Sequence, residues 1–262
     1  MLRGLYSSTA GMNVQQAKVE NISNNMANAT TPGYKKEELL VQSFPEHLLI
    51  EQGGPKRKDG MPLKSPNASI GSLCNGSQIA ETLTDYTAGT LQETGNSTDI
   101  AIKGPGFFVV SAPTQEEPER ICYTRNGSFK LDLEGYLTLN GRYRVLGEAG
   151  EIQVGSDKFT VSQDGSIEVD GAVVDRLRLV EFDDLNSLSK EGECLYTVEQ
   201  GSERQAEATT VFQGRLEMSN VNVVDEMAQL ISVMRAYEAN QRIIQSYDEI
   251  LSKAVNQVGS IR

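Results

Sequence analysis

Residues 223–259 read VVDEMAQLISVMRAYEANQRIIQSYDEILSKAVNQVG. Apolar side chains return at every seventh position of this stretch, which is the spacing of a coiled-coil seam. These positions are Leu230, Tyr237, Ile244, Leu251 and Val258, and they alternate with Met227, Met234, Gln241, Asp248 and Val255. Asn222 can cap the backbone N–H of Asp225, and Gly259 offers a stop. The stretch therefore predicts one helix, roughly 50 Å long at about 1.5 Å per residue.

The first thirty residues predict a second helix. Its apolar side chains also recur at an interval of seven, at Leu5, Met12, Val19 and Met26, with Ile22 beside the last two. Thr31-Pro32-Gly33 ends the pattern. A globular helix usually buries a wider face, so this single row favours a coiled-coil contact with one or two partner helices.

The middle of the chain, from about Asp99 to Met218, has many short alternating runs and no helical period. Turn-forming pairs separate these runs at hairpin-like intervals. The pairs are Asn126-Gly127, Glu134-Gly135, Asn140-Gly141, Asp164-Gly165 and Asp170-Gly171. We expect an all-β domain with antiparallel strand pairing here.

The segment before the β domain contains Pro45, Pro55, Pro62 and Pro66, scattered glycines and only brief strand-like pieces. It is interpreted as an extended connector whose ordering costs chain entropy that its own contacts hardly offset. The predicted fold class is α+β, a mostly β middle domain flanked by helices that pair as a coiled-coil-like unit. The four predicted zones are an N-terminal assembly helix at 1–33, the connector at 34–96, the all-β domain at 97–218 and a C-terminal assembly helix at 219–262.

The composition argues against two classes of partner. A formal net charge of −12 provides no basic face for a nucleic acid, and the one dense basic stretch, Lys56-Arg57-Lys58, is typical of a solvated loop. No apolar run approaches the roughly 20 residues that span a bilayer. The N-terminus turns polar at once and lacks the apolar core of a secretory signal. We expect neither nucleic-acid binding nor membrane insertion.

The sequence does not favour an enzyme. The single histidine, His47, lies in the connector, where a solvated or assembly-contacting role is more typical than catalysis. The many carboxylates include no pair that stands apart as a catalytic acid and base. Cys74, Cys122 and Cys194 are far apart and odd in number, as expected of free thiols. No catalytic residue, cofactor site or metal site is assigned.

Both ends of the chain suggest polymerisation. Two narrow seams cannot be fully buried by one helical pair, so apolar edges remain that copies of the chain could cover. Asn21, Asn24, Asn25 and Asn28 share one helical face. This amide row either meets another backbone or amide row and fixes the register of that contact, or it is a solvated surface. The predicted assembly interface comprises Leu5, Met12, Val19, Asn24, Asn25, Met26, Asn28, Leu230, Met234, Tyr237, Ile244 and Leu251.

Motifs in three parts of the chain resemble those of bacterial flagellar rod and hook proteins. The N-terminal motif is Ser23-Asn24-Asn25-Met26-Ala27-Asn28 followed by Thr31-Pro32-Gly33-Tyr34-Lys35. The C-terminal motif begins at Gly214-Arg215-Leu216-Glu217-Met218-Ser219-Asn220 and continues to Glu226, with Arg235-Ala236-Tyr237-Glu238-Ala239-Asn240 beyond it. Two further motifs lie in the β domain, Asp99-Ile100-Ala101-Ile102-Lys103-Gly104-Pro105-Gly106-Phe107-Phe108 and Tyr123-Thr124-Arg125-Asn126-Gly127-Ser128-Phe129.

The resemblance implies a structural subunit of the flagellar basal-body rod. Its terminal helices would pack into the inner tube of a drive shaft that transmits motor torque to the hook. It implies export through the flagellar type III apparatus, location in the basal body of the cell envelope, and copies of itself and other rod and hook proteins as partners. One middle β domain favours a rod protein, distal rod first, over the hook protein.

Two alternatives remain. Residues 44–72 do not clearly reproduce the insertion that characterises distal-rod proteins, which leaves a proximal-rod or hook-type axial protein open. A more remote alternative is a secreted β-domain adhesin with the helices as a stalk. An adhesin of this kind should present a clustered aromatic face, whereas the chain has no Trp and its tyrosines are dispersed.

Overall fold

The structure is a computed structural model of the 262-residue chain, and it describes residues 2–50, 69–113, 120–156, 158–192, 194–198, 203–206 and 209–259. The basic stretch Lys56-Arg57-Lys58 and most prolines of the predicted connector lie outside these residues. Contacts divide the chain into two units. The helix unit contains residues 1–23, 39–82 and 227–262, and the β unit contains residues 24–38 and 83–226.

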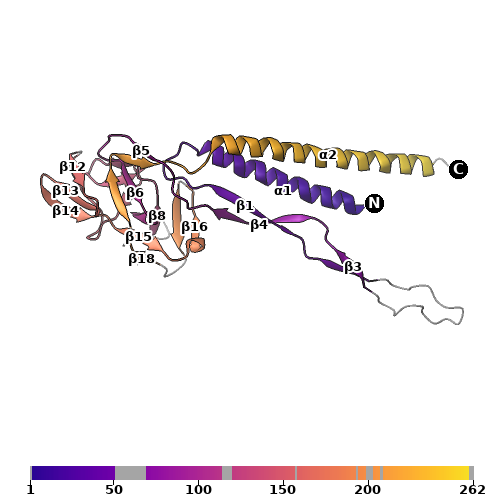
Figure 1. The fold of residues 1–262 in the computed structure, drawn as a ribbon, viewed down its shortest axis with the longest axis horizontal. Helices are drawn as coiled ribbons and strands as arrows, with labels where there is room; N and C mark the ends of the chain where they lie inside the picture. Colours follow the sequence, from indigo (N-terminus) through magenta and orange to yellow (C-terminus); the bar gives the residue numbers. More distant parts are fainter. Residues whose placement is uncertain are drawn as a thin grey trace. The chain divides into compact units, whose positions relative to one another are not determined.

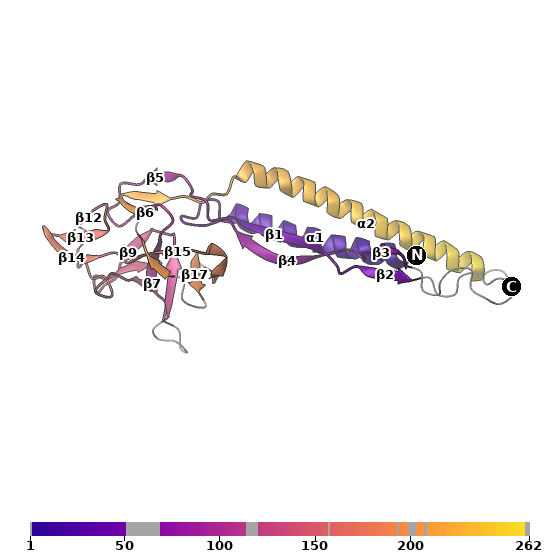
Figure 2. The same ribbon diagram turned by 60° about the horizontal axis from the view of Figure 1, so that its bottom comes forward.

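Two long helices and a mostly β middle region confirm the predicted α+β class. Helix α1 spans Leu2–Ala27 and helix α2 spans Val223–Gly259. Asn222 caps α2 as predicted, but its side-chain oxygen accepts the N–H of Val224 at 3.1 Å rather than that of Asp225. Its amide instead donates to the Asp225 carboxylate at 2.8 Å. In Figures 1 and 2, α1 and α2 run side by side.

The helix unit also contains strands, in the segment predicted as an extended connector. These strands are β1 (Glu37–Ser43), β2 (His47–Ile50), β3 (Ser69–Leu73) and β4 (Ser77–Thr84). Strand β1 pairs with β4, and β2 pairs antiparallel with β3. The described part of this segment is therefore ordered by pairing between strands that lie far apart in sequence, which short local patterns do not reveal.

The β unit is built from antiparallel strand pairs, as predicted. Its central sheet has the path β16-β17-β8-β7-β11-β10-β9, and β15 pairs with both β7 and β18. A three-stranded sheet β12-β13-β14 and the pairs β19-β6 and β20-β5 complete the described strands.

The bounds of these strands are β5 Leu91–Glu93, β6 Ile100–Lys103, β7 Phe107–Ser111, β8 Ile121–Thr124, β9 Phe129–Leu131, β10 Leu137–Leu139, β11 Tyr143–Val145, β12 Phe159–Val161, β13 Ser166–Val169, β14 Ala172–Arg176, β15 Leu179–Phe182, β16 Leu188–Lys190, β17 Leu195–Val198, β18 Glu203–Gln205, β19 Thr210–Gln213 and β20 Arg215–Glu217. A short 3-10 helix, Leu185–Ser187, precedes β16.

Strand β7 lies at the centre of the β unit because its two faces serve two apolar clusters. Phe108 and Val110 belong to the larger cluster, whereas Phe107 and Val109 point into the smaller one. All four side chains are fully buried. This alternation is the period of two that a strand buried on both faces requires.

The predicted Asp170-Gly171 pair forms a two-residue hairpin loop in the β unit. It joins β13 to β14 with φ of +52° and +83°, the left-handed region that a two-residue hairpin loop needs. Asn140 and Gly141 also have positive φ, between β10 and β11. Four of the five predicted turn pairs thus join paired strands, whereas Asn126-Gly127 connects β8 to β9, which do not pair in the described sheets.

Candidate assembly surfaces

Two glycines of α1 let α2 approach closely in the helix unit. A Cβ placed on Gly4 would lie 2.2 Å from the hydroxyl oxygen of Tyr247, and one on Gly11 would lie 3.1 Å from the side-chain nitrogen of Asn240. The contacts advance by seven residues along α1 and return by seven along α2, so the helices are antiparallel. This is the heptad interval that the sequence suggested.

Helix α2 has two faces of different exposure. Four predicted interface residues are partly buried, namely Leu230, Tyr237, Ile244 and Leu251. The fifth, Met234, is 51 % exposed. An alternating set of seam positions therefore lies away from the helix pair and remains open to solvent.

Helix α1 buries residues that the heptad pattern did not select. Leu5, Met12, Val19 and Met26 are all only partly buried. Val14 and Ile22, eight residues apart, are each 5 % exposed. Sequence reasoning missed Val14 because only the heptad row was followed, although Ala10, Val14 and Ile22 fall on one face at multiples of four.

The asparagine row is used within the chain itself, in the β unit. Buried Asn25 donates to the carbonyl of Glu37 at 2.9 Å and accepts the N–H of the same residue at 3.1 Å. The hydroxyl of Tyr34 donates to Asn25 at 3.1 Å and to Asn24 at 3.3 Å, and Asn28 donates to Asn24 at 2.7 Å. These amides stabilise the chain reversal after α1. Asn25 thus meets another backbone segment, as one of the two interpretations of the row expected, but it does so within its own chain.

A buried ion cluster lies next to this reversal. The ammonium of Lys35 contacts Glu217 at 2.5 Å and donates to the carbonyl of Thr87 at 2.8 Å. Arg125 contacts the second oxygen of Glu217 at 3.5 Å, and the N–H of Gly89 donates to the first at 3.0 Å. Burial lowers the pKa of Lys35, and the nearby Glu217 carboxylate opposes that shift.

A second ion pair reaches the first turn of α2. The ammonium of Lys36 lies 3.0 Å from the carboxylate of Glu226, whose side chain is 2 % exposed. The backbone N–H of Lys36 donates to Asn220 at 2.8 Å, and Asn220 donates to the carbonyl of Asp85 at 2.9 Å. Burial opposes the charge of Lys36, but its pairs with Glu226 and Glu38 outweigh burial and raise its pKa.

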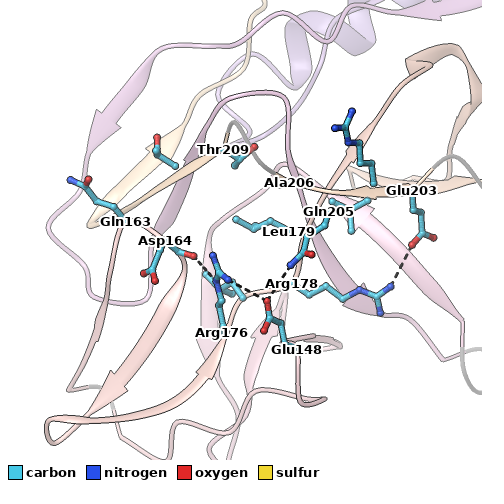
Figure 3. A pocket seen from close by; sticks show the side chains of 14 residues that line it. Glu148, Gln163, Asp164, Arg176, Arg178, Leu179, Glu203, Gln205, Ala206 and Thr209 are labelled. Carbon is cyan, nitrogen blue, oxygen red and sulfur yellow. Dashed lines mark hydrogen bonds and ion pairs between the residues drawn. The ribbon is translucent and has the colours of Figure 1, made fainter.

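A cavity of about 770 Å³ opens in the β unit around β14, β15 and β18 (Figure 3). Arg178 lies 3.4 Å from Glu203, and Arg176 lies 3.6 Å from Glu148 while donating to the carbonyl of Asp164. Since these guanidinium groups already face carboxylates, neither is a free anion site. Among the described residues no cluster of His, Cys, Asp and Glu could hold a metal ion, and no helix is long and apolar enough to cross a membrane.

Three family models match the chain. They are the flagellar basal-body rod protein model at residues 5–35, the flagellar hook protein FlgE/F/G D1 domain at residues 101–169, and the flagellar basal body rod FlgEFG protein C-terminal model at residues 213–258. The chain is also similar over its whole length to proteins of several bacteria.

A Bacillus subtilis flagellar hook-basal body complex protein, FlhO, is 32 % identical, with 100 % of both chains covered. A Buchnera aphidicola flagellar basal-body rod protein FlgG is 33 % identical over 97 % of this chain and 98 % of the relative. A Caulobacter vibrioides flagellar basal-body rod protein FlgF is 32 % identical over 100 % of both. The chain belongs to the flagellar basal-body rod protein family.

Membership in the rod family confirms the predicted resemblance and the location in the flagellar basal body. A rod-family protein is a structural subunit, and it assembles with other rod and hook proteins. The remote adhesin alternative loses its basis, because the matches extend over the helices as well as the β unit.

Three of the four rod-family motifs meet at Glu217. Tyr34-Lys35 comes from the N-terminal motif, Arg125 from a motif of the β domain and Glu217 from the C-terminal motif. The remaining motif does not reach Glu217 but packs against the Tyr123–Phe129 motif, since a Cβ on Gly127 would lie 1.6 Å from the carbonyl oxygen of Ile100. The motifs were read from the sequence as a signature, but their physical meeting point was not predicted.

Proposed function

We propose that this chain is a distal-rod subunit that self-assembles through its terminal helices into a tubular drive shaft. The observation that carries the proposal is the antiparallel contact of Gly4 with Tyr247 and of Gly11 with Asn240. It pairs the two ends of the chain and leaves apolar positions such as Met234 in solvent, where neighbouring copies can cover them. The twelve residues predicted from the sequence remain the proposed assembly interface.

Torque transmission requires subunits that resist deformation. Within the β unit, the Lys35–Glu217 and Lys36–Glu226 pairs fix the segment after α1 to the segment that leads into α2. Buried, hydrogen-bonded ion pairs resist sliding because separating one leaves an uncompensated buried charge. Resistance to sliding supports a mechanical role for the chain, and we propose no catalytic role.

The distal rod is favoured over the hook protein because the chain has one middle β domain between its terminal helices. A proximal-rod subunit is the second candidate, because residues 44–72 do not clearly reproduce the insertion that characterises distal-rod proteins.

We also propose export through the flagellar type III apparatus, which passes unfolded chains. The three cysteines are free thiols, so no disulfide among them has to be opened before passage.

Electron microscopy of basal bodies from cells lacking this chain tests the proposal. We expect the axial structure to stop short at the distal rod, with no hook, and to be restored by the intact gene. Complete rods and hooks in the deletion strain would refute a rod role, whereas loss of the whole rod from its base would favour the proximal alternative.

A further inference from the structure

A groove of about 860 Å³, with His47 as its one titratable side chain besides Tyr6, lies in the helix unit between α1 and the paired strands. Tyr6, Ala10 and Val14 line one side of it, and Phe44, Leu49 and Ile79 line the other. None of the 14 described residues along it is Asp, Glu, Lys or Arg. In a chain of net charge −12 such a surface is suited to an apolar partner.

Helix α2 presents a matching surface. Met227, Ile231 and Met234 are 49 %, 55 % and 51 % exposed, and their spacing of four and three places them on one face. We refer to these three residues as the α2 stripe. Residues 227–234 read MAQLISVM, the longest uncharged run in the helix.

The α2 stripe does not fill the groove of its own chain, because it is exposed in the structure. Copies of a strongly acidic chain repel one another, so they meet most readily where neither surface carries charge. The groove and the α2 stripe both satisfy this condition. Anchors at i, i+4 and i+7 are the pattern by which a helix occupies an apolar groove.

We propose that the groove receives the α2 stripe of a second copy of the chain. This rests on the proposed self-assembly and names the surfaces that meet. A groove on one copy and a stripe on the next make a heterologous contact, which extends into an open array when the rotation does not close.

Cys74 provides a natural probe of this contact. It is exposed between Leu73 and Asn75, which both line the groove, whereas Cys122 and Cys194 are buried. Cells producing Ile231→Cys in place of the native chain are treated with a short bifunctional thiol reagent, and their basal bodies are purified. We expect a covalent dimer several-fold more abundant than in the native chain.

Two matched variants control the experiment. Ser232→Cys is exposed one position away, on a different face of the helix, and should give little dimer. Ile231→Cys combined with Cys74→Ser should give none. Met227→Cys on the α2 stripe should repeat the Ile231→Cys result, which guards against a local effect of one substitution.

The outcomes separate the two proposals. Dimer that depends on Cys74 and on the α2 stripe supports the groove contact. Equal dimer from Ser232→Cys, dimer that persists without Cys74, or none at all in intact motile cells overturns the groove contact and leaves the rod role standing. Absence of the chain from basal bodies overturns both.

Discussion

Lys35 and Glu217 form an ion pair from which solvent is excluded, with 0 % and 1 % of their side chains exposed and 2.5 Å between the charged atoms. They are far apart in sequence, and the pair fixes the segment that follows α1 to the strand that precedes α2. Arg125 contributes a second cation, and its guanidinium group lies 4.7 Å from the centre of the Phe107 ring. Three of the four rod-family motifs are thus joined by one carboxylate.

Replacing Lys35 with methionine should destabilise the β unit by about 3–5 kcal/mol, the usual effect of removing one partner from a buried ion pair. Glu217 would keep Arg125 at 3.5 Å but lose its nearest cation. Urea unfolding of the full chain, followed by tyrosine fluorescence, measures the loss. Lys130→Met, at an exposed position of β9, is the matched control, and similar losses in both variants would contradict the prediction.

Tyr196→Phe and Tyr34→Phe should change stability in opposite directions. The hydroxyl of Tyr196 is buried and has no hydrogen-bond partner among the described residues, so its removal should stabilise the fold by about 1 kcal/mol. The hydroxyl of Tyr34 donates to Asn24 and Asn25, and its removal should cost about 1 kcal/mol. Thermal unfolding of the two variants in parallel checks the signs.

Alkaline pH should weaken the β unit. Burial raises the pKa of Tyr86 to about 12, and it raises the pKa of Tyr34, Tyr123 and Tyr196 as well. A pKa raised in the folded state means that stability is complete below the unfolded value of about 10 and is lost as pH rises through the folded value. Each such tyrosine contributes a slope of up to about 1.4 kcal/mol per pH unit.

Lys35 acts in the opposite sense, because its pKa is lowered on folding and its effect ends near the unfolded value of about 10.4. Above that pH the tyrosines dominate. Urea midpoints measured from neutral pH to about pH 12 should fall beyond pH 10, and less steeply for Tyr196→Phe. A midpoint that stays constant across this range would be incompatible with the prediction.

Alanine at Gly4 and at Gly11 should separate helix propensity from helix packing. Alanine favours a helix by up to about 1 kcal/mol over glycine, so Gly11→Ala should be neutral or stabilising if the Asn240 amide shifts slightly. Gly4→Ala should lose that gain, because its methyl group would lie 2.2 Å from the hydroxyl oxygen of Tyr247 and 2.6 and 2.9 Å from two of its ring carbons. Thermal melting followed by helical circular dichroism distinguishes them, and an equal gain in both would place Tyr247 elsewhere.

Local signals in the sequence predicted local structure well. The cap at Asn222, the two helices and the Asp170-Gly171 turn depend on neighbours within a few residues, and all three are present. The pairing of β2 with β3 was missed because its partners are separated by residues outside any short window. When a strand is stabilised mainly by pairing with a distant segment, its own residues show only a weak strand preference.

The environment of the residues proposed for assembly was predicted in less detail, for a related reason. Heptad spacing selected Leu230 and Ile244, but it could not tell which seam faces α1 and which faces solvent, as Met234 does. Glu217 was quoted as part of a motif without a role, since a single acidic residue gives no sign of the two cations that its carboxylate meets. Such convergence depends on the complete fold.

Ile244→Asp tests the helix seam directly. Ile244 is partly buried in the isolated chain, and further burial in an array would leave an introduced carboxylate without a partner, at a cost of several kcal/mol. Motility and rod formation should therefore be lost, while the tyrosine signal of the folded β unit is unchanged. Gln245→Asp, at the exposed neighbouring position, should swim normally. Normal motility in cells that carry Ile244→Asp would show that this face of α2 does not enter the assembly.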